Sequence, residues 1–295
     1  MDLFQTSKMQ LIYRIFCRLL RGNHETEPCN SDARYAEGSF LTQCKEAFSS
    51  DVNLGLSLFD LVNRAFDCMP VAAVLSQQLF CCHGGIPHTD TYPGSNAIDV
   101  LNELPRKCHG ERITHVNILD ALSSWTDDQW SQARWNGCNP CVGIPSNLSR
   151  QDEQQRLLRF KSRQRSLNAA YQVMWADPYS TLDAPESGFY SKEDFGVSGA
   201  QRPRVLYFTL PAVHAFFGKH GCTRIIRGHQ GKRTGVHLQL FANVITIFSD
   251  SCDHFKSAVS HDGSNLPSMT LCGCILVDND AIRCILCQPM TGLSD

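Results

Sequence analysis

The chain has 295 residues, of which 42% are hydrophobic, and this excludes wholesale disorder because a packed core can form. Its 27 basic and 29 acidic residues leave a formal net charge of −2, so no global charge draws the chain to nucleic acid or anionic lipid. No uninterrupted run of about 18 apolar residues occurs, so the sequence predicts no membrane span.

Cysteine usage indicates the redox state of the chain. The 15 cysteines are odd in number, and the apolar segment Leu11–Leu20 is broken by two arginines, unlike a secretory signal. We therefore expect reduced thiols and a location in the cytoplasm or nucleus, with a mitochondrial presequence as the alternative. Two C-x-x-C pairs occur. Cys138 and Cys141 flank a turn-like Asn-Pro and could hold a metal or a disulfide, whereas Cys284 and Cys287 lie in an apolar run that we assign to the core.

The first predicted elements surround two polar loops. The segment Ile15–Leu20 fits either a strand or a helical spacing and leads into the loop Arg21–Glu25, which reads RGNHE. An amphipathic helix is predicted over Ser57–Pro70 and ends at the proline. Val71–Gly85 is then predicted to form a hairpin of two buried strands that turns at Ser76–Gln78. Its second strand, Leu79–Cys82, places His83 on a Gly-Gly loop.

The composition changes over about residues 88–172, where Pro, Asn, Ser and Gly are common and three tryptophans (Trp125, Trp130 and Trp135) are scattered. We interpret this stretch as a region inserted into a single catalytic-type domain that covers residues 1–295. Within it, Arg156–Arg165 carries five basic residues in the sequence RLLRFKSRQR and is most simply a solvated helix face. The alternative is a docking surface for an acidic partner.

Regular patterns return in the last third of the chain. A helix is predicted over Ala212–Gly221, ended by its glycine, and a short strand within Thr223–Gln230 places His229 on a loop. Asn243–Asp250 is predicted as a buried strand, and Thr270–Cys287 as a terminal hairpin that turns at Asp278–Asp280. Helical and strand patterns together predict a mixed fold of the α/β or α+β class.

Polar groups follow an apolar run beside a glycine at three separate places: Asn23 with His24, His83, and His229. Loops of this kind gather at the carboxyl ends of strands, where ligands bind in α/β sheets. Two imidazoles and an amide oxygen form a borderline ligand set suited to Mn, Fe or Zn. A single histidine of this kind is more often a hydrogen-bonded structural residue, but three such junctions favour a site.

Four motifs in this order, LLRGNHE, FDCMPVAAVLSQQLFCCHGG, MWADP and RIIRGHQ, resemble the phosphoprotein phosphatase family of Ser/Thr phosphatases, which are calcineurin-like metallophosphoesterases. The resemblance implies that family's β-sandwich flanked by helices. A lone His229 followed by Gln230, where phosphodiesterases usually carry a GH-x-H pair, favours the protein phosphatase branch.

The resemblance also implies roles by position. A dinuclear centre of two divalent ions would activate a water for the hydrolysis of phosphoserine or phosphothreonine. The second ion of that centre would be held by Asn23, His83 and His229. His24 matches the general acid, Arg204 matches an arginine that grips the substrate phosphate, and Asp177 matches a supporting carboxylate.

Two family motifs, GD-x-HG and GD-x-x-DRG, do not occur in the sequence, and they would supply the first metal's ligands. We therefore expect a chain that lacks the N-terminal part of the domain, with its first strands missing and its hydrolysis of phosphoproteins impaired. The alternative is a catalytically inactive pseudophosphatase that acts as a protein-binding module. A regulatory or scaffold partner would then bind through the insertion at 88–172.

Overall fold

The computed structural model describes residues 18–104, 150–179, 194–197, 206–249, 271–278 and 281–287. Two compact units make up the chain, and each is described by itself. The helical unit combines Met1–Ala73 with Pro87–Met174, and the sheet unit combines Val74–Ile86 with Trp175–Asp295. None of the helices in the described ranges has the length and apolar character that a bilayer crossing requires.

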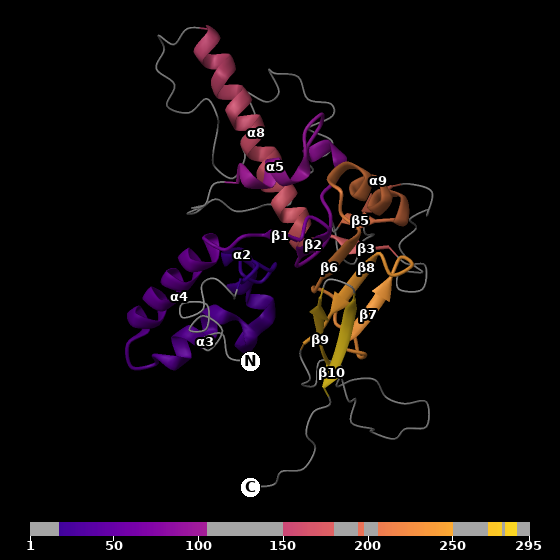
Figure 1. The fold of residues 1–295 in the computed structure, drawn as a ribbon. Coiled ribbons are helices and arrows are strands. Elements are labelled where there is room, and N and C mark those ends of the chain that lie inside the picture. Colours follow the sequence, from indigo (N-terminus) through magenta and orange to yellow (C-terminus); the bar gives the residue numbers. More distant parts are fainter. Residues whose placement is uncertain are drawn as a thin grey trace. The chain divides into compact units, whose positions relative to one another are not determined.

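Helices and short 3₁₀ turns build the helical unit (Figure 1). In chain order they are α2 (Glu27–Asn30), η1 (Ala33–Gly38), α3 (Phe40–Ala47), α4 (Val52–Asp67), η2 (Thr89–Thr91), α5 (Ala97–Asn102) and α8 (Arg150–Trp175), whose last residue belongs to the sheet unit. The helix predicted over Ser57–Pro70 is thus confirmed as α4, although it starts earlier, because the Asp51 side chain caps it at the amides of Asn53 and Leu54.

The packing of α4 on α3 shows why the helix forms. Phe59 and Phe66, one face of α4, are buried, and their rings lie 5.9 Å and 6.3 Å from that of Phe40 on α3. Gly55 allows the two helices to approach closely, since a Cβ at this position would stand 2.5 Å from the Cys44 carbonyl oxygen. Apolar burial on one face therefore stabilises this helix pair.

A five-stranded sheet in the order β1-β2-β6-β8-β7 is the centre of the sheet unit. Its strands are β1 (Ala72–Leu75), β2 (Leu79–Cys82), β6 (Arg224–Arg227), β7 (Val236–Gln239) and β8 (Val244–Ile247). The β2, β6 and β8 strands are parallel, and β7 is antiparallel to β8. Because β2 and β6 are parallel neighbours with Cys81 opposite Ile226, the loops that follow them begin side by side.

One helix packs its apolar face against this sheet. Helix α9 (Leu210–His220) buries Phe216, whose ring meets that of Phe80 on β2 at 5.0 Å, edge to face. The helix ends where Gly221 adopts a φ of 72°, which confirms the helix predicted over Ala212–Gly221. Phe80, Ile225 and Val244, from three successive strands, are fully buried and form the core of this layer.

Two smaller sheets complete the unit. The first has the order β3-β5-β4, with β3 (Asp177–Pro178), β5 (Leu206–Phe208) and β4 (Phe195–Val197). The second is the antiparallel hairpin of β9 (Cys272–Val277) and β10 (Ile282–Cys287), drawn in yellow in Figure 1. The predicted terminal hairpin is therefore confirmed, as is the mixed α/β fold.

Other sequence predictions differ from the structure or fall outside it. The hairpin over Val71–Gly85 is confirmed, but only β2 is well buried, because β1 lies at the edge of the sheet. A strand or helix was predicted over Ile15–Leu20. Its last three residues have no regular secondary structure, and its first three lie outside the described residues. The three tryptophans of the insertion and the pair Cys138 and Cys141 also lie outside them.

The assignment of Cys284 and Cys287 to the core was wrong. Both side chains are exposed, and nearly all of β10 is exposed with them. Among the described residues, β10 pairs with β9 in a two-stranded sheet, and its side chains lie exposed rather than packed as in a sheet interior. Arg156–Arg165, in contrast, lies within α8 as predicted, and the side chains of Arg159 and Arg163 are exposed.

The turn between β1 and β2 yields a stability test. Ser76 and Gln77 have φ angles of 50° and 58°, and the amide of Gln78 donates to the Leu75 carbonyl across the turn. Left-handed backbone costs a residue with a Cβ about 1–2 kcal/mol. Gln77→Gly is therefore expected to stabilise the protein by about 1 kcal/mol in urea unfolding, after the larger entropy of glycine in the unfolded chain is subtracted. Gln78→Gly, where φ is not positive, is the matched control and should bring no gain.

Candidate functional site

Two histidines stand at the ends of neighbouring parallel strands. His83 follows β2 and His229 lies two residues beyond β6. The backbone of the two loops is joined, because the amide of Gly228 donates to the His83 carbonyl over 3.0 Å. The two imidazole rings lie edge to face with centroids 5.4 Å apart. The structure thus brings these two predicted site residues together, from positions far apart in the sequence.

The backbone and the ring of His229 are both constrained. Its φ of 63° places a residue with a Cβ in the left-handed region, which persists only where surrounding contacts hold it. The ring nitrogen Nδ1 lies 2.8 Å from Oδ1 of Asp177, and both side chains are buried, with exposed fractions of 5% and 2%. A carboxylate behind one ring nitrogen sets the orientation of the imidazole and leaves Nε2 as the nitrogen for a ligand.

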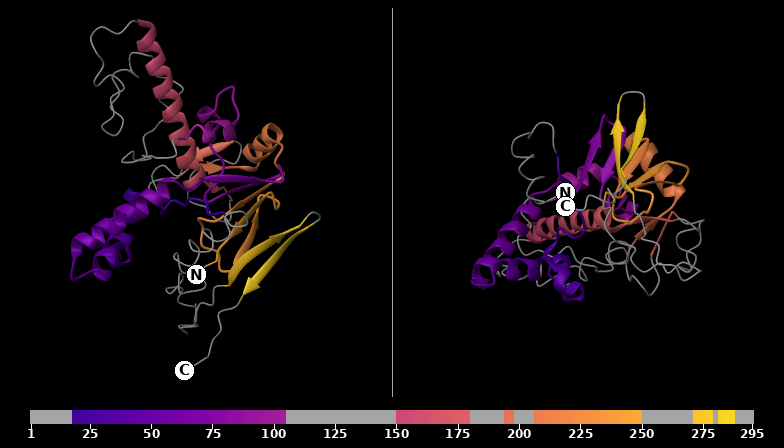
Figure 2. Two further views of the ribbon diagram at one scale, coloured as in Figure 1. Left: turned by 60° about the vertical axis from the view of Figure 1, so that its left-hand side comes forward. Right: turned by 90° about the horizontal axis from the view of Figure 1, so that it is seen from below.

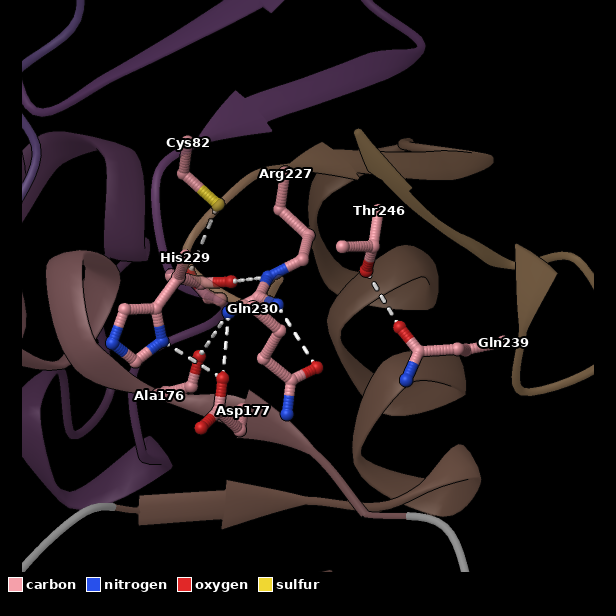
Figure 3. A network of polar contacts seen from close by, with 10 residues as sticks. Cys82, Ala176, Asp177, Arg227, His229, Gln230, Gln239 and Thr246 are labelled. Carbon is pink, nitrogen blue, oxygen red and sulfur yellow. Dashed lines mark hydrogen bonds and ion pairs between the residues drawn. The ribbon is translucent and has the colours of Figure 1, made fainter. Parts of the chain in front are cut away.

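Arg227, the last residue of β6, ties three loops together, as Figure 3 shows. Its guanidinium is fully buried and donates to Asp177 Oδ1 over 2.7 Å and to the Ala176 carbonyl over 3.3 Å. The same group donates to the Gly84 carbonyl in the loop after His83, and to Gln230 Oε1 over 3.1 Å. One cation therefore fixes the segments that carry His83, Asp177 and His229.

The charge state of Asp177 follows from these contacts. Burial by itself would raise the pKa of this carboxyl, but the hydrogen bond with His229 and the charge of Arg227 lower it, and the net pKa lies below its usual value. Asp177 is therefore an anion at neutral pH. Burial lowers the pKa of Arg227, but an arginine remains charged in proteins, so the two form a buried ion pair.

The loop Arg21–Glu25 is held in the helical unit by its first arginine. The Arg21 guanidinium, 6% exposed, pairs with Asp67 Oδ1 at 2.8 Å and donates through Nε to the Glu25 carbonyl over 2.9 Å. The Arg21 amide donates to the Pro70 carbonyl over 2.8 Å. Between these anchors, Asn23 is buried, whereas the ring of His24 is exposed and lies 5.2 Å from that of Tyr35.

The predicted site residues thus fall into three groups. His83, Asp177 and His229 lie together in the sheet unit. Asn23 and His24 belong to the helical unit, and their part in the same site stays a prediction. Arg204 lies outside the described residues.

Sequence reasoning missed Arg227 as a member of the network. The available signal was an arginine directly after the two apolar residues of the strand RIIR, because a charge that enters a core requires a partner there. It also missed Trp175, whose ring lies 5.7 Å from that of His229.

The donor atoms fit part of a metal site. Two imidazoles, one of them oriented by a carboxylate, are ligands that Zn, Mn and Fe accept. Within the described ranges, no group of three or more His, Cys, Asp and Glu side chains is arranged to hold a metal ion. The sheet unit therefore offers two imidazole ligands, those of His83 and His229.

Comparison with known proteins identifies a family of metal-dependent phosphoesterases and a similar fold. Residues 2–233 match the model of the family described as calcineurin-like phosphoesterase. Among solved structures, the fold is similar to that of a protein serine/threonine phosphatase from Saccharomyces cerevisiae with similarity to human phosphatase PP5. The TM-score is 0.52 at 16% sequence identity, over 98% of this chain and 65% of that chain. At this identity the likeness concerns the fold alone, and this chain spans slightly less than two thirds of that protein.

The buried ion pair yields a second stability test. Asp177→Ala is expected to lower the free energy of unfolding by about 3–5 kcal/mol, because the Arg227 guanidinium would stay buried without its anion. Equilibrium unfolding in urea measures this loss. The matched control is Asp32→Asn, which breaks a pair whose Arg34 side chain is 86% exposed and should leave stability unchanged. Equal effects of the two substitutions would contradict the role given to the buried pair.

Proposed function

The chain belongs to the calcineurin-like phosphoesterase family, and from this premise we propose that it binds divalent metal and hydrolyses phosphoserine and phosphothreonine in proteins. One observation carries the proposal: His229, in left-handed backbone, is held by Asp177 against His83 at the ends of two parallel strands. Strained backbone, a buried carboxylate and paired imidazoles in one place are typical of a functional site rather than of residues that only pack the core.

The proposed metal ligands are His83, His229 and the amide oxygen of Asn23. A bound divalent ion supplies Lewis-acid activation of the phosphoryl group and of the attacking water. The chain itself orients the ligands: Asp177 holds the His229 ring, and Arg227 holds the loops of both histidines through their backbone and side-chain acceptors. Two imidazoles and an amide oxygen form a ligand set that Mn, Fe and Zn each accept.

The proposed general acid is His24, which protonates the oxygen of the departing serine or threonine. Its ring is exposed, as a group that meets substrate must be, while the loop beneath it is fixed through the buried Arg21. Arg204 is proposed to bind the substrate phosphate, because a guanidinium fork matches two phosphate oxygens.

Weak activity is part of the proposal. The motifs GD-x-HG and GD-x-x-DRG do not occur in the sequence, and the three proposed ligands are all neutral, so no ligand in this set offsets the charge of the ion. We expect low metal affinity and slow turnover from the 295-residue chain. The same observation favours a second candidate function, an inactive pseudophosphatase that binds proteins through residues 88–172. In support, α8 exposes Leu158, Arg159 and Arg163 within that stretch.

Metal binding can be measured without turnover. Titration of the chain with Mn²⁺, followed by electron paramagnetic resonance of the free ion, should show one weak site that His83→Ala and His229→Ala each abolish. His214→Ala is the matched control, since this histidine is exposed on α9 and should leave the titration unchanged. Binding that survives both site substitutions would place the metal elsewhere and refute the ligand assignment.

The role of His24 can be separated from metal binding by the choice of substrate. An aryl phosphate has a good leaving group, whereas a serine oxygen needs a proton as it departs. His24→Ala should therefore slow the hydrolysis of a phosphoserine peptide by about 100-fold and that of an aryl phosphate much less. Phosphate release with Mn²⁺ measures both rates. An equal loss of rate on both substrates in the His24→Ala variant would refute the acid role. If the unsubstituted chain binds metal but hydrolyses neither substrate, the pseudophosphatase is favoured.

A further inference from the structure

The C-terminal hairpin places two cysteines opposite each other. Strands β9 and β10 pair antiparallel, and Cys272, the first residue of β9, is the register partner of Cys287, the last residue of β10. Figure 2 shows the two strands in yellow, side by side in both views. The two residues are 15 positions apart in the sequence, so only the strand pairing brings them together.

The register separates this pair from the other cysteines of the hairpin. Side chains alternate along a strand, so directly opposed residues point to the same face. Cys274 also lies on the face of Cys272, but its register partner is Ile285, and its diagonal distance to Cys287 is about 7–8 Å. Cys284 lies on the opposite face and faces Ile275. In the described part of the chain, Cys272 and Cys287 are the cysteines that stand in direct register.

The spacing of opposed strand residues fits a disulfide. In an antiparallel pair, facing Cα atoms are about 4.5–5.5 Å apart, and a disulfide accepts Cα separations of about 4.4–6.8 Å. The Cβ atoms of such a pair are about 4.5–5.5 Å apart and must approach to about 3.5–4.5 Å. The pair ends both strands, where a small shift of the backbone disrupts few ladder hydrogen bonds.

Access distinguishes these thiols from those of the core. Cys287 is exposed and Cys272 is half-buried. In contrast, the thiol of Cys82 on β2 is buried in the sheet. A thiol must be reached by its oxidant and must face a second thiol before an intramolecular disulfide can form. Cys272 and Cys287 combine access with direct register.

We propose that Cys272 and Cys287 form a reversible disulfide by exchange with a small-molecule disulfide, such as oxidised glutathione. One protein thiolate attacks a sulfur of the oxidant and releases one reduced thiol, which leaves a mixed disulfide. The second protein thiolate then attacks this bond and releases the second reduced thiol. Two electrons pass from the protein to the oxidant, and the two protein thiol protons end on the two released thiols. An exposed disulfide of this kind is readily reduced again.

The modification has a defined structural consequence. In the reduced chain the Cys272 thiol donates to the Ser249 carbonyl over 2.9 Å, just beyond β8. The same corner is joined by the Gly273 amide, which donates to the Phe248 carbonyl over 2.9 Å, and by close backbone contact between Gly273 and Gly235. A disulfide has no proton to donate, so oxidation removes the bond to Ser249 while it links β9 to β10.

Peptide mapping tests the proposal on the full chain. After incubation with oxidised glutathione, alkylation of free thiols and denaturation, trypsin cuts after Lys256 and Arg283 and yields the peptides 257–283 and 284–295. We expect these peptides to be joined, and a reductant to separate them. The double variant Cys274→Ser/Cys284→Ser leaves one cysteine in each peptide and should retain the link.

The matched loss-of-link variant is Cys287→Ser, an exposed substitution that should leave the unfolding temperature of the reduced protein unchanged. A link that persists in this variant, glutathione adducts without a link, or links only between two chains would each overturn the proposal. Absence of any link in the double variant would also overturn it, since that variant retains both proposed partners.

Discussion

The buried ion pair of Arg227 and Asp177 is the interaction on which the candidate site depends. Each charge is costly to remove from water, and each is offset by the other and by hydrogen bonds to surrounding acceptors and donors. The pair also has a geometric effect. Because Asp177 contacts His229 and Arg227 contacts the loop after His83, the two imidazoles share one rigid support.

Parallel pairing explains why this support stands where it does. Strands β2 and β6 run in the same direction, so both loops leave the sheet at one edge, and β3 brings Asp177 to the same place. His83 and His229, which belong to distant motifs, meet there because β2 and β6 are parallel and end on the same side of the sheet. The left-handed backbone of His229 is tolerated because the surrounding contacts hold its ring and both of its neighbours in sequence.

Much of this arrangement was predictable from local signals. The hairpin before His83, the helix ended by Gly221 and the strand before His229 each carried a strong pattern of apolar residues and turn chemistry. Arg227 was missed because a strand pattern records which residues are apolar, not which acceptors meet the charge at its end. The burial of Cys284 and Cys287 was predicted wrongly because an apolar run does not reveal whether a second layer covers it.

The sequence by itself determined the family, the mixed fold and the identity of His83, His229 and Asp177 as candidate site residues, because these depend on short motifs and on period-specific patterns. Only the tertiary structure decided that Arg227 joins their loops. It also decided that the residue opposite Cys272 is Cys287 and not Cys284. The reason is physical: strand register and the partners of a buried charge are set by contacts between segments far apart in the chain, and local composition does not encode those distances.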